Sequence, residues 1–169
     1  MNIFFDLDGT LTDSGVGVTR CLQHYVETGM FENDLYPGVP EALGALTRDG
    51  HRIWVVTSKY IVYADRIVDH FGLRGWLQRV YGAELSGINA DKRRLIRHAL
   101  DDAHLEARGT WMVGDRIHDV RGARENGVSA IAALWGYGSA GELREAKPDH
   151  LATSMREVGP IITRAGEIR

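Results

Sequence analysis

Three of the apolar runs that the sequence offers as strands end in clusters of polar residues. These residues are Asp6, Asp8 and Thr10 after the first run, Thr57, Ser58 and Lys59 after the second, and Asp115 and Asp119 after the fourth. In an open parallel sheet the carboxyl ends of neighbouring strands share one edge, and ligands bind at that edge. We therefore expect acids that lie far apart in the sequence to meet in one site.

The pair Asp6 and Asp8 indicates the chemistry of this site. Residues two apart on a strand point the same way, so these carboxylates would repel each other and Asp115 unless a cation lay among them. Ligands that are all oxygen favour Mg²⁺, and a hard cation beside a lysine and hydroxyl groups can neutralise a phosphoryl group. The residues therefore predict phosphoryl transfer. A calcium-binding EF-hand is excluded because its sixth position would be Leu11 rather than glycine.

Each cluster also has a purely structural interpretation. An acid after a strand is commonly a helix N-cap or a turn residue, and Asp8-Gly9 alone is an ordinary turn dipeptide. The conjunction of three clusters at one sheet edge favours the functional interpretation.

The elements that would position these clusters alternate between short β-rich runs and helical patterns, which is typical of βαβ units. Five strands are expected, at 2–5, 52–57, 79–82, 109–113 and 129–134. Apolar residues three and four apart predict helices that include 39–46, 61–71, 92–100 and 117–126. The expected fold class is α/β, a Rossmann-like three-layer α/β/α sandwich with a five-stranded, mainly parallel sheet.

Two further helices are expected near the C-terminus. Ser139 with Glu142, and Ser154 with Glu157, have the spacing of a capping box. A helix should therefore begin after each serine.

The composition describes one globular domain and excludes several classes of function. The 169 residues are 44% hydrophobic and 25% charged, with a net charge of −3, which indicates neither nucleic acid nor a membrane as a partner. The single cysteine, Cys21, excludes an internal disulfide and a cysteine metal cage. Because no run resembles a signal sequence or a membrane span, we expect a cytoplasmic protein.

Four motifs together resemble those of the haloacid dehalogenase superfamily, and specifically its phosphoglycolate-phosphatase-like branch. They are FFDLDGTLTDS, VVTSK, the lysine of INADKRRLIRHAL, and MVGDRIHD, in that order. The resemblance covers most of the chain, and DHFGL, ENGV and WGYGSAGEL add to it. It implies a parallel sheet with the first strand at its centre. It also implies a phosphatase that hydrolyses phosphate monoesters through an aspartyl-phosphate, with Mg²⁺ as cofactor.

The resemblance assigns a role to each acid of the motifs. Asp6 resembles the nucleophile that attacks phosphorus, and it also binds Mg²⁺. Asp8 resembles the general acid that protonates the leaving group and then the general base that activates water, and it is counted among the metal ligands. Asp115 resembles a direct metal ligand, whereas Asp119 acts through water or orients the other ligands.

The remaining motif residues would bind the phosphate. Thr57 would hydrogen-bond a phosphate oxygen, helped by the backbone of Ser58 at the start of the next helix. Lys92 resembles the lysine that pairs with the nucleophile and the phosphate. Lys59 is expected either to line the pocket or to be a solvated surface residue.

Two further features of the motifs concern the substrate. Gly9 allows the tight turn after the acids and Thr10 supports it, so both are counted with the substrate-binding residues. Many relatives have serine and asparagine where this chain has Arg116 and His118, although the GDRxHD form resembles one subgroup. His118 is either a substrate contact or an ordinary surface residue.

The chain departs most from the family between Ser14 and Tyr36. Relatives insert a helical cap of several dozen residues there, but this chain has 21 residues, 15–35, enough for about one helix at 18–28 and a loop. We therefore expect a single core domain, 1–169, in which this segment is a vestigial cap.

The missing cap bears on the substrate. Without a lid that excludes water, a small substrate gains few contacts beyond its phosphate. Three alternatives stay open: the substrate is large, a second subunit of a homo-oligomer covers the site, or the enzyme is unselective. Trp135 and Tyr137, after the fifth strand, would form a contact surface for any of these or pack against the core.

Other functions fit the residues less well. A dehalogenase has no use for the acid at Asp8, and a mutase needs a lid to retain its intermediate. A response-regulator receiver carries its phosphorylated aspartate on a later strand, whereas the second strand here ends in Val56-Thr57 without an acid. A non-catalytic phosphate-binding or signalling protein on the same scaffold is the alternative that the sequence leaves open.

Overall fold

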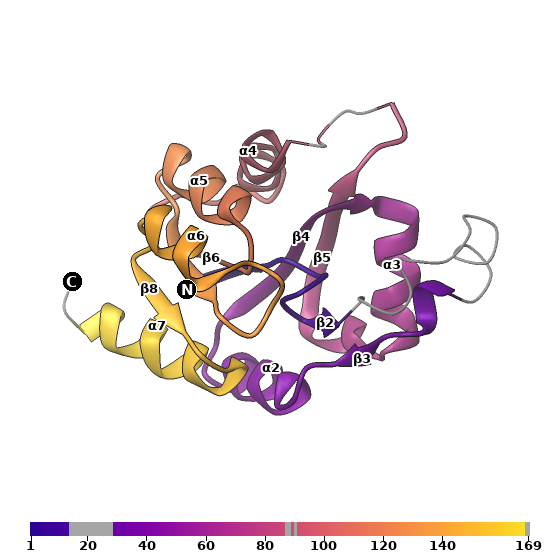
Figure 1. Cartoon of the computed structure of the whole chain (residues 1–169), viewed down its shortest axis with the longest axis horizontal. Coiled ribbons are helices and arrows are strands. Elements are labelled where there is room, and N and C mark those ends of the chain that lie inside the picture. Colours follow the sequence, from indigo (N-terminus) through magenta and orange to yellow (C-terminus); the bar gives the residue numbers. More distant parts are fainter. Residues whose placement is uncertain (14–28, 87–88, 90, 168–169) are drawn as a thin grey trace.

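A six-stranded parallel sheet forms the centre of the computed structural model, which describes residues 1–13, 29–86, 89 and 91–167. The strand order is β5-β4-β1-β6-β7-β8, so the first strand is central, as expected (Figure 1). The strands are β1 (Asn2–Phe5), β4 (Arg52–Tyr60), β5 (Leu77–Ala83), β6 (Thr110–Gly114), β7 (Ser129–Ala133) and β8 (His150–Ala152). A separate antiparallel pair joins β2 (Thr12–Asp13) to β3 (Asp34–Leu35).

Helices cover both faces of the large sheet (Figure 1). One face carries α2 (Val39–Arg48), α3 (Ile61–His70) and α7 (Val158–Glu167), and the other carries α4 (Lys92–Asp102), α5 (Ile117–Glu125) and α6 (Ala140–Glu145). Short 3-10 helices are η1 (Gly29–Phe31), η2 (Leu73–Trp76) and η3 (Met155–Glu157). The expected three-layer α/β/α class is confirmed.

Strand β1 shows why the sheet is covered on both sides. Ile3 and Phe5 are buried against one helix layer, and Phe4 is buried against the other. Successive side chains of a strand point to opposite faces, so a strand between two layers is a continuous apolar run. The run Asn2–Phe5 is followed by Asp6, the first of the polar residues at this end of the strand.

The expectation of five strands was wrong by one. β8 pairs in parallel with β7 at the sheet edge, and of its three residues only Ala152 is buried. Such a short edge strand has no apolar alternation long enough for the sequence to reveal it.

Only one of the two expected capping boxes forms its serine cap. Ser139 accepts a hydrogen bond from the backbone N–H of Glu142 at 3.2 Å and begins α6. The carboxylate of Glu157 instead accepts from the N–H and hydroxyl of Thr153, at 2.8 and 2.6 Å. The chain after Ser154 therefore starts with η3 before α7.

The helix expected at 18–28 lies outside the described residues, as does Cys21. Within the part of the chain that the structure describes, no helix has the length and apolar character to cross a membrane.

Candidate active site

The carboxyl ends of β4, β1 and β6 lie side by side and bring the expected clusters together. Phe5 pairs in register with Val55 of β4 and with Val113 of β6. The backbone N–H of Asp6 continues the ladder by donating to the carbonyl of Val113 at 2.9 Å. Because β1 and β6 end side by side and β4 runs past them, Asp6, Thr57 and Asp115 meet at one edge.

Lys92, the first residue of α4, links two of the motif acids. Its Nζ lies 2.8 Å from Asp6 Oδ1 and 2.9 Å from Asp119 Oδ1, and it donates to the Val56 carbonyl at 2.9 Å. The side chain is buried. Burial lowers the pKa of Lys92, but the charges of Asp119 and Asp6 outweigh burial and raise it above its ordinary value. Lys92 is therefore a fixed positive charge beside Asp6.

Three carboxylates form a candidate metal centre at this edge. Asp6, Asp115 and Asp119 each offer one oxygen, and these oxygens lie within 4.8 Å of one another. Burial, together with the charges of Asp6 and Asp119, raises the pKa of Asp115 to about 6. Burial also raises the pKa of Asp119 against the opposing charge of Lys92. This buried cluster of oxygen ligands fits a hard divalent cation, which would remove the repulsion.

Glycines make room for these carboxylates. Gly9 has φ +78°, and a β-carbon there would overlap the carboxylate of Asp115. A β-carbon on Gly136 would also overlap Asp115, and one on Gly114 would overlap Asp119. The acids are therefore packed against backbone on several sides, which fixes their positions.

Asp8 lies outside the group of three carboxylates. Its Oδ2 pairs with Lys59 Nζ at 2.9 Å, so Lys59 lies in the pocket, one of the two alternatives that the sequence left open. Its Oδ1 is buried and has no hydrogen-bond partner among the described residues.

Of the two residues at the end of β4 that were expected to bind phosphate, Ser58 is placed differently from the expectation. Thr57 is buried and its Oγ1 accepts the backbone N–H of Lys59 at 3.2 Å. Ser58 lies within β4, because the strand continues to Tyr60 and α3 begins only at Ile61. The prediction that Ser58 stands at the start of the next helix is therefore wrong.

A cavity of about 310 Å³ opens at this edge. Its walls are formed by Asp6, Asp8, Thr57, Ser58, Lys59, Lys92, Arg116, His118, Asp119 and Tyr137. Gly9 and Thr10 do not line it. Both are buried, and the Thr10 hydroxyl donates to Asp115 Oδ1 at 3.4 Å. A larger cavity of about 500 Å³ between α2 and α7 contains none of the expected site residues.

The loop after β7 supplies support that the sequence reasoning missed. The backbone N–H of Tyr137 donates to Asp115 Oδ2 at 2.8 Å, and Trp135 Nε1 donates to the carbonyl of Thr10 at 3.0 Å. The Tyr137 hydroxyl donates to Asp13 at 2.7 Å. Tyr137 also lines the cavity, and Trp135 packs against the core. The packing alternative is therefore confirmed for Trp135, and a contact surface at Tyr137 stays a prediction. The WGYG run of small and aromatic residues was the only feature of the sequence that indicated this support of the site.

Fold and site together define a hydrolase of the α/β class whose clustered aspartates and lysine suit phosphate chemistry. The profile of the haloacid dehalogenase-like hydrolase family matches residues 32–133. A 5'-nucleotidase from Pseudomonas aeruginosa is 35% identical over 95% of this chain and 95% of its own length. The chain therefore belongs to the haloacid dehalogenase-like hydrolase family, and it is an enzyme of the family's phosphatase type.

Other similar proteins carry names of different activities. The tyrosine-protein kinase PtkA of Mycobacterium bovis is 29% identical over 82% of this chain. A phosphoglycolate phosphatase from Nitrosococcus oceani is 24% identical over 87%. This chain spans only 63% and 65% of the lengths of those two proteins. A solved structure from Clostridium acetobutylicum, described as a predicted phosphatase, superposes with a TM-score of 0.91 at 27% identity, covering 96% of this chain and 98% of that one. The expected resemblance is confirmed.

Proposed function

We propose that this protein is a Mg²⁺-dependent phosphatase that hydrolyses phosphate monoesters through an aspartyl-phosphate on Asp6. One observation carries the proposal: Lys92 holds Asp6 and Asp119 together at the mouth of a cavity that also contains Asp8. A fixed cation beside a carboxylate nucleophile can stabilise the negative charge of a phosphoryl group during transfer.

The expected cofactor fits the residues present. Asp6, Asp115 and Asp119 would hold Mg²⁺, since their oxygens already lie within 4.8 Å of one another. When bound, Mg²⁺ supplies positive charge that neutralises the carboxylates and the phosphate oxygens. Asp8, whose carboxylate pairs with Lys59, is assigned a proton-transfer role.

The proposed reaction has two steps. An Asp6 carboxylate oxygen attacks phosphorus, the bond from phosphorus to the leaving oxygen breaks, and Asp8 gives that oxygen a proton. Water then attacks the phosphorus of the aspartyl-phosphate, Asp8 takes a proton from it, and the bond from Asp6 to phosphorus breaks. Inorganic phosphate and the free alcohol are the products, and both aspartates return to their starting states.

Two cationic or polar groups would hold the phosphate during these steps. Lys92 is positioned to neutralise phosphate oxygens that approach Asp6, because its Nζ lies 2.8 Å from Asp6 Oδ1. Thr57, which lines the same cavity, would donate its hydroxyl to a phosphate oxygen. Lys59 would hold Asp8 in place at 2.9 Å.

The substrate and the surroundings of the site are also proposals. We infer an open site, because only 21 residues, 15–35, stand where relatives carry a cap. The substrate would then be large, or a second copy of the chain would cover the mouth. The name of the Pseudomonas aeruginosa relative makes nucleoside 5'-monophosphates the first compounds to test. A cytoplasmic location is retained as a prediction.

The test is hydrolysis of p-nitrophenyl phosphate with Mg²⁺ and with a chelator, for the parent protein, Asp6→Asn and the control Asp101→Asn. Asp101 is an exposed aspartate at the far end of α4. We expect Asp6→Asn to lose at least about a thousandfold in kcat/KM, because the covalent route is lost. Unchanged activity in that variant would overturn the covalent mechanism. If neither this ester nor nucleotides, sugar phosphates and phosphopeptides are hydrolysed, a non-catalytic phosphate-binding protein replaces the proposal.

A further inference from the structure

Two side chains of the fourth motif that carry N–H donors lie in the catalytic cavity without a role in the proposed reaction. Arg116 and His118 line the same cavity as Asp6 and Asp8, and both side chains are exposed. They precede Asp119, which faces the metal centre. These two side chains are therefore available to contact a part of the substrate other than its scissile phosphate.

The backbone of Arg116 is fixed while its guanidinium is available. The backbone N–H donates to Asp119 Oδ2 at 3.0 Å, which caps α5. The guanidinium Nε lies 3.9 Å from Glu142 Oε1, and its side chain is 50% exposed. That oxygen of Glu142 already accepts the N–H of Ile117 at 3.3 Å. An ion pair with this distance and exposure contributes little to the stability of the fold. The guanidinium can therefore leave Glu142 and contact a ligand at a small cost in free energy.

The charges of the catalytic cavity leave Arg116 available once the metal site is filled. Asp8 is paired with Lys59 at 2.9 Å, and Lys92 lies between Asp6 and Asp119. Without a metal ion, the three acids and the three cations that line the cavity, Arg116 included, balance in charge. The proposed Mg²⁺ would add positive charge at the carboxylate cluster. Arg116 would then be a cation on the cavity wall that keeps only a long contact to an acid.

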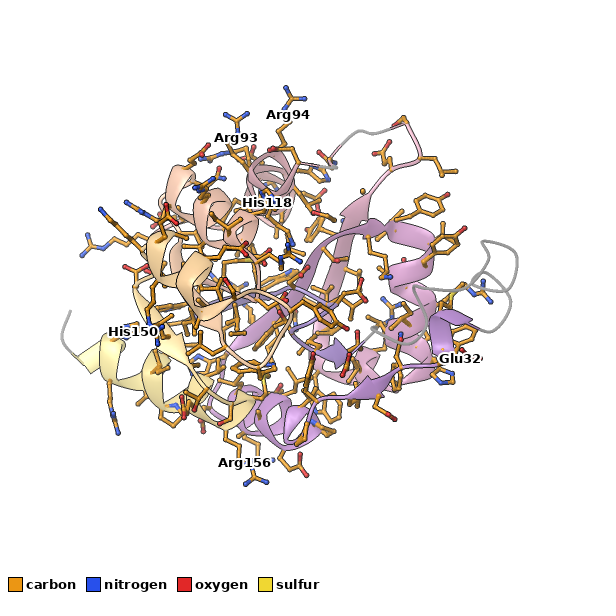
Figure 2. All side chains as sticks on the ribbon, viewed as in Figure 1. Glu32, Arg93, Arg94, His118, His150 and Arg156 are labelled. Carbon is orange, nitrogen blue, oxygen red and sulfur yellow. The ribbon has the colours of Figure 1, made fainter. Side chains whose placement is uncertain are left out.

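A second cavity of about 280 Å³ adjoins the first, and both are lined by Lys92 and His118. Its other walls come from α4 and α5 and include Arg121, an exposed residue. The acids there, Asp91 and Glu125, lie 3.7 and 3.4 Å from Arg93 Nε, so these two acids and the two arginines balance in charge. Figure 2 shows Arg93 and His118 on this side of the molecule. Side chains with N–H donors therefore continue from the catalytic cavity across His118 to Arg121.

We propose that Arg116, His118 and Arg121 bind a second anionic group of the substrate, a phosphate or a carboxylate, beside the scissile phosphate. The proposal rests on the phosphatase function proposed above. The planar guanidinium suits both groups because it donates two parallel hydrogen bonds. Contacts to a second anion would supply the selectivity that a short cap cannot supply.

The test compares matched substrates with and without the second anion. 3-Phosphoglycerate is compared with glycerol 3-phosphate for a carboxylate, and adenosine 3',5'-bisphosphate with adenosine 5'-monophosphate for a phosphate. The readout is the ratio of kcat/KM for the dianionic member over its partner, measured with Mg²⁺ at low ionic strength. We expect at least one pair to show a ratio above about ten, and the ratio to decrease with added salt.

The variants assign the preference to the side chains. Arg116→Ala should lower the ratio about tenfold, and the charge-retaining Arg116→Lys should lower it less. The control Arg156→Ala removes an exposed arginine that Figure 2 shows at the opposite edge of the molecule from Arg93, and it should leave the ratio unchanged. A parent protein with ratios near one for both pairs would overturn the proposal, and so would a ratio that Arg116→Ala and Arg116→Lys both leave unchanged.

Failure of this proposal is distinguishable from failure of the phosphatase function. p-Nitrophenyl phosphate has no second anionic group, so its Mg²⁺-dependent hydrolysis reports only on the catalytic residues. Hydrolysis of this ester combined with ratios near one would remove the second-anion site and leave the phosphatase function standing. The pair that shows the higher ratio identifies the second anion as carboxylate or phosphate.

Discussion

Replacement of Asp115 by asparagine should stabilise the protein in the absence of metal and abolish its stabilisation by Mg²⁺. Asp115 is fully buried beside two other carboxylates, and no lysine lies within ion-pair distance of it among the described residues. Asparagine has nearly the same shape and can still accept the Tyr137 N–H, which now donates to Asp115 Oδ2 at 2.8 Å. The substitution therefore removes one charge from a repelling cluster and one ligand from the metal centre.

The magnitude follows from the pKa of Asp115. Its rise from 3.8 to about 6 corresponds to roughly 3 kcal/mol at 1.36 kcal/mol per pKa unit. The folded protein holds this proton more tightly than the unfolded chain, so stability is lost as the pH rises from 3.8 to about 6, and the full cost is present above pH 6. Asp115→Asn should therefore raise the free energy of unfolding by about 3 kcal/mol at pH 7.5, and by much less near pH 4.

Urea denaturation with a chelator, at both pH values, measures this difference. A second series adds Mg²⁺, which should stabilise the parent by about 2.7 kcal/mol at a hundred times its Kd and leave Asp115→Asn unchanged. Asp101→Asn serves as the matched control, because this aspartate is exposed and 3.7 Å from Arg97. Equal stability of variant and parent in chelator at pH 7.5, or equal stabilisation of both by Mg²⁺, would refute the reasoning.

Three further outcomes follow from contacts around the site. Lys92→Met should lower the free energy of unfolding of the metal-free protein by about 3–5 kcal/mol, because two buried carboxylates lose their counter-charge. Urea denaturation measures this difference, and a loss of stability under about 1 kcal/mol would contradict the prediction. Gly9→Ala should weaken Mg²⁺ binding in titration calorimetry, because a β-carbon there overlaps Asp115; an unchanged Kd would be the contrary result. Trp135→Phe should cost about 1 kcal/mol in thermal unfolding, through the lost hydrogen bond to the Thr10 carbonyl, and no change in Tm would contradict that assignment.

The strands and helices that surround the site could be predicted because their patterns are local. The run Asn2–Phe5 was predicted with the bounds that the structure has, since a central strand of a parallel sheet is apolar throughout. Helix α2 was found from its apolar spacing and from Pro40 near its start. Strand β8 escaped prediction because only one of its three residues is buried.

Local patterns failed where another hydrogen-bond partner competes for the same atoms, either a near neighbour in the sequence or another strand. Ser154 has the spacing of a capping box, but Glu157 bonds to Thr153. Ser58 was expected to begin a helix, yet pairing with β5 extends β4 to Tyr60, in register with Ala83. Sheet pairing and side-chain competition depend on neighbours in space, which spacing along the chain does not reveal.

The sequence by itself determined the chemical groups of the site and the sheet edge at which they gather, because residue types and strand ends are local properties. The resemblance already implied that Lys92 pairs with Asp6. Only the tertiary structure showed that Lys92 also pairs with Asp119 and that Lys59 pairs with Asp8. These contacts depend on how far each strand and helix extends over the edge, and a shift of a few ångströms would exchange one partner for another. The energy of an ion pair inside a protein changes steeply over such distances. The packing of strands and helices, which sets these distances, therefore decides which acid each lysine pairs with.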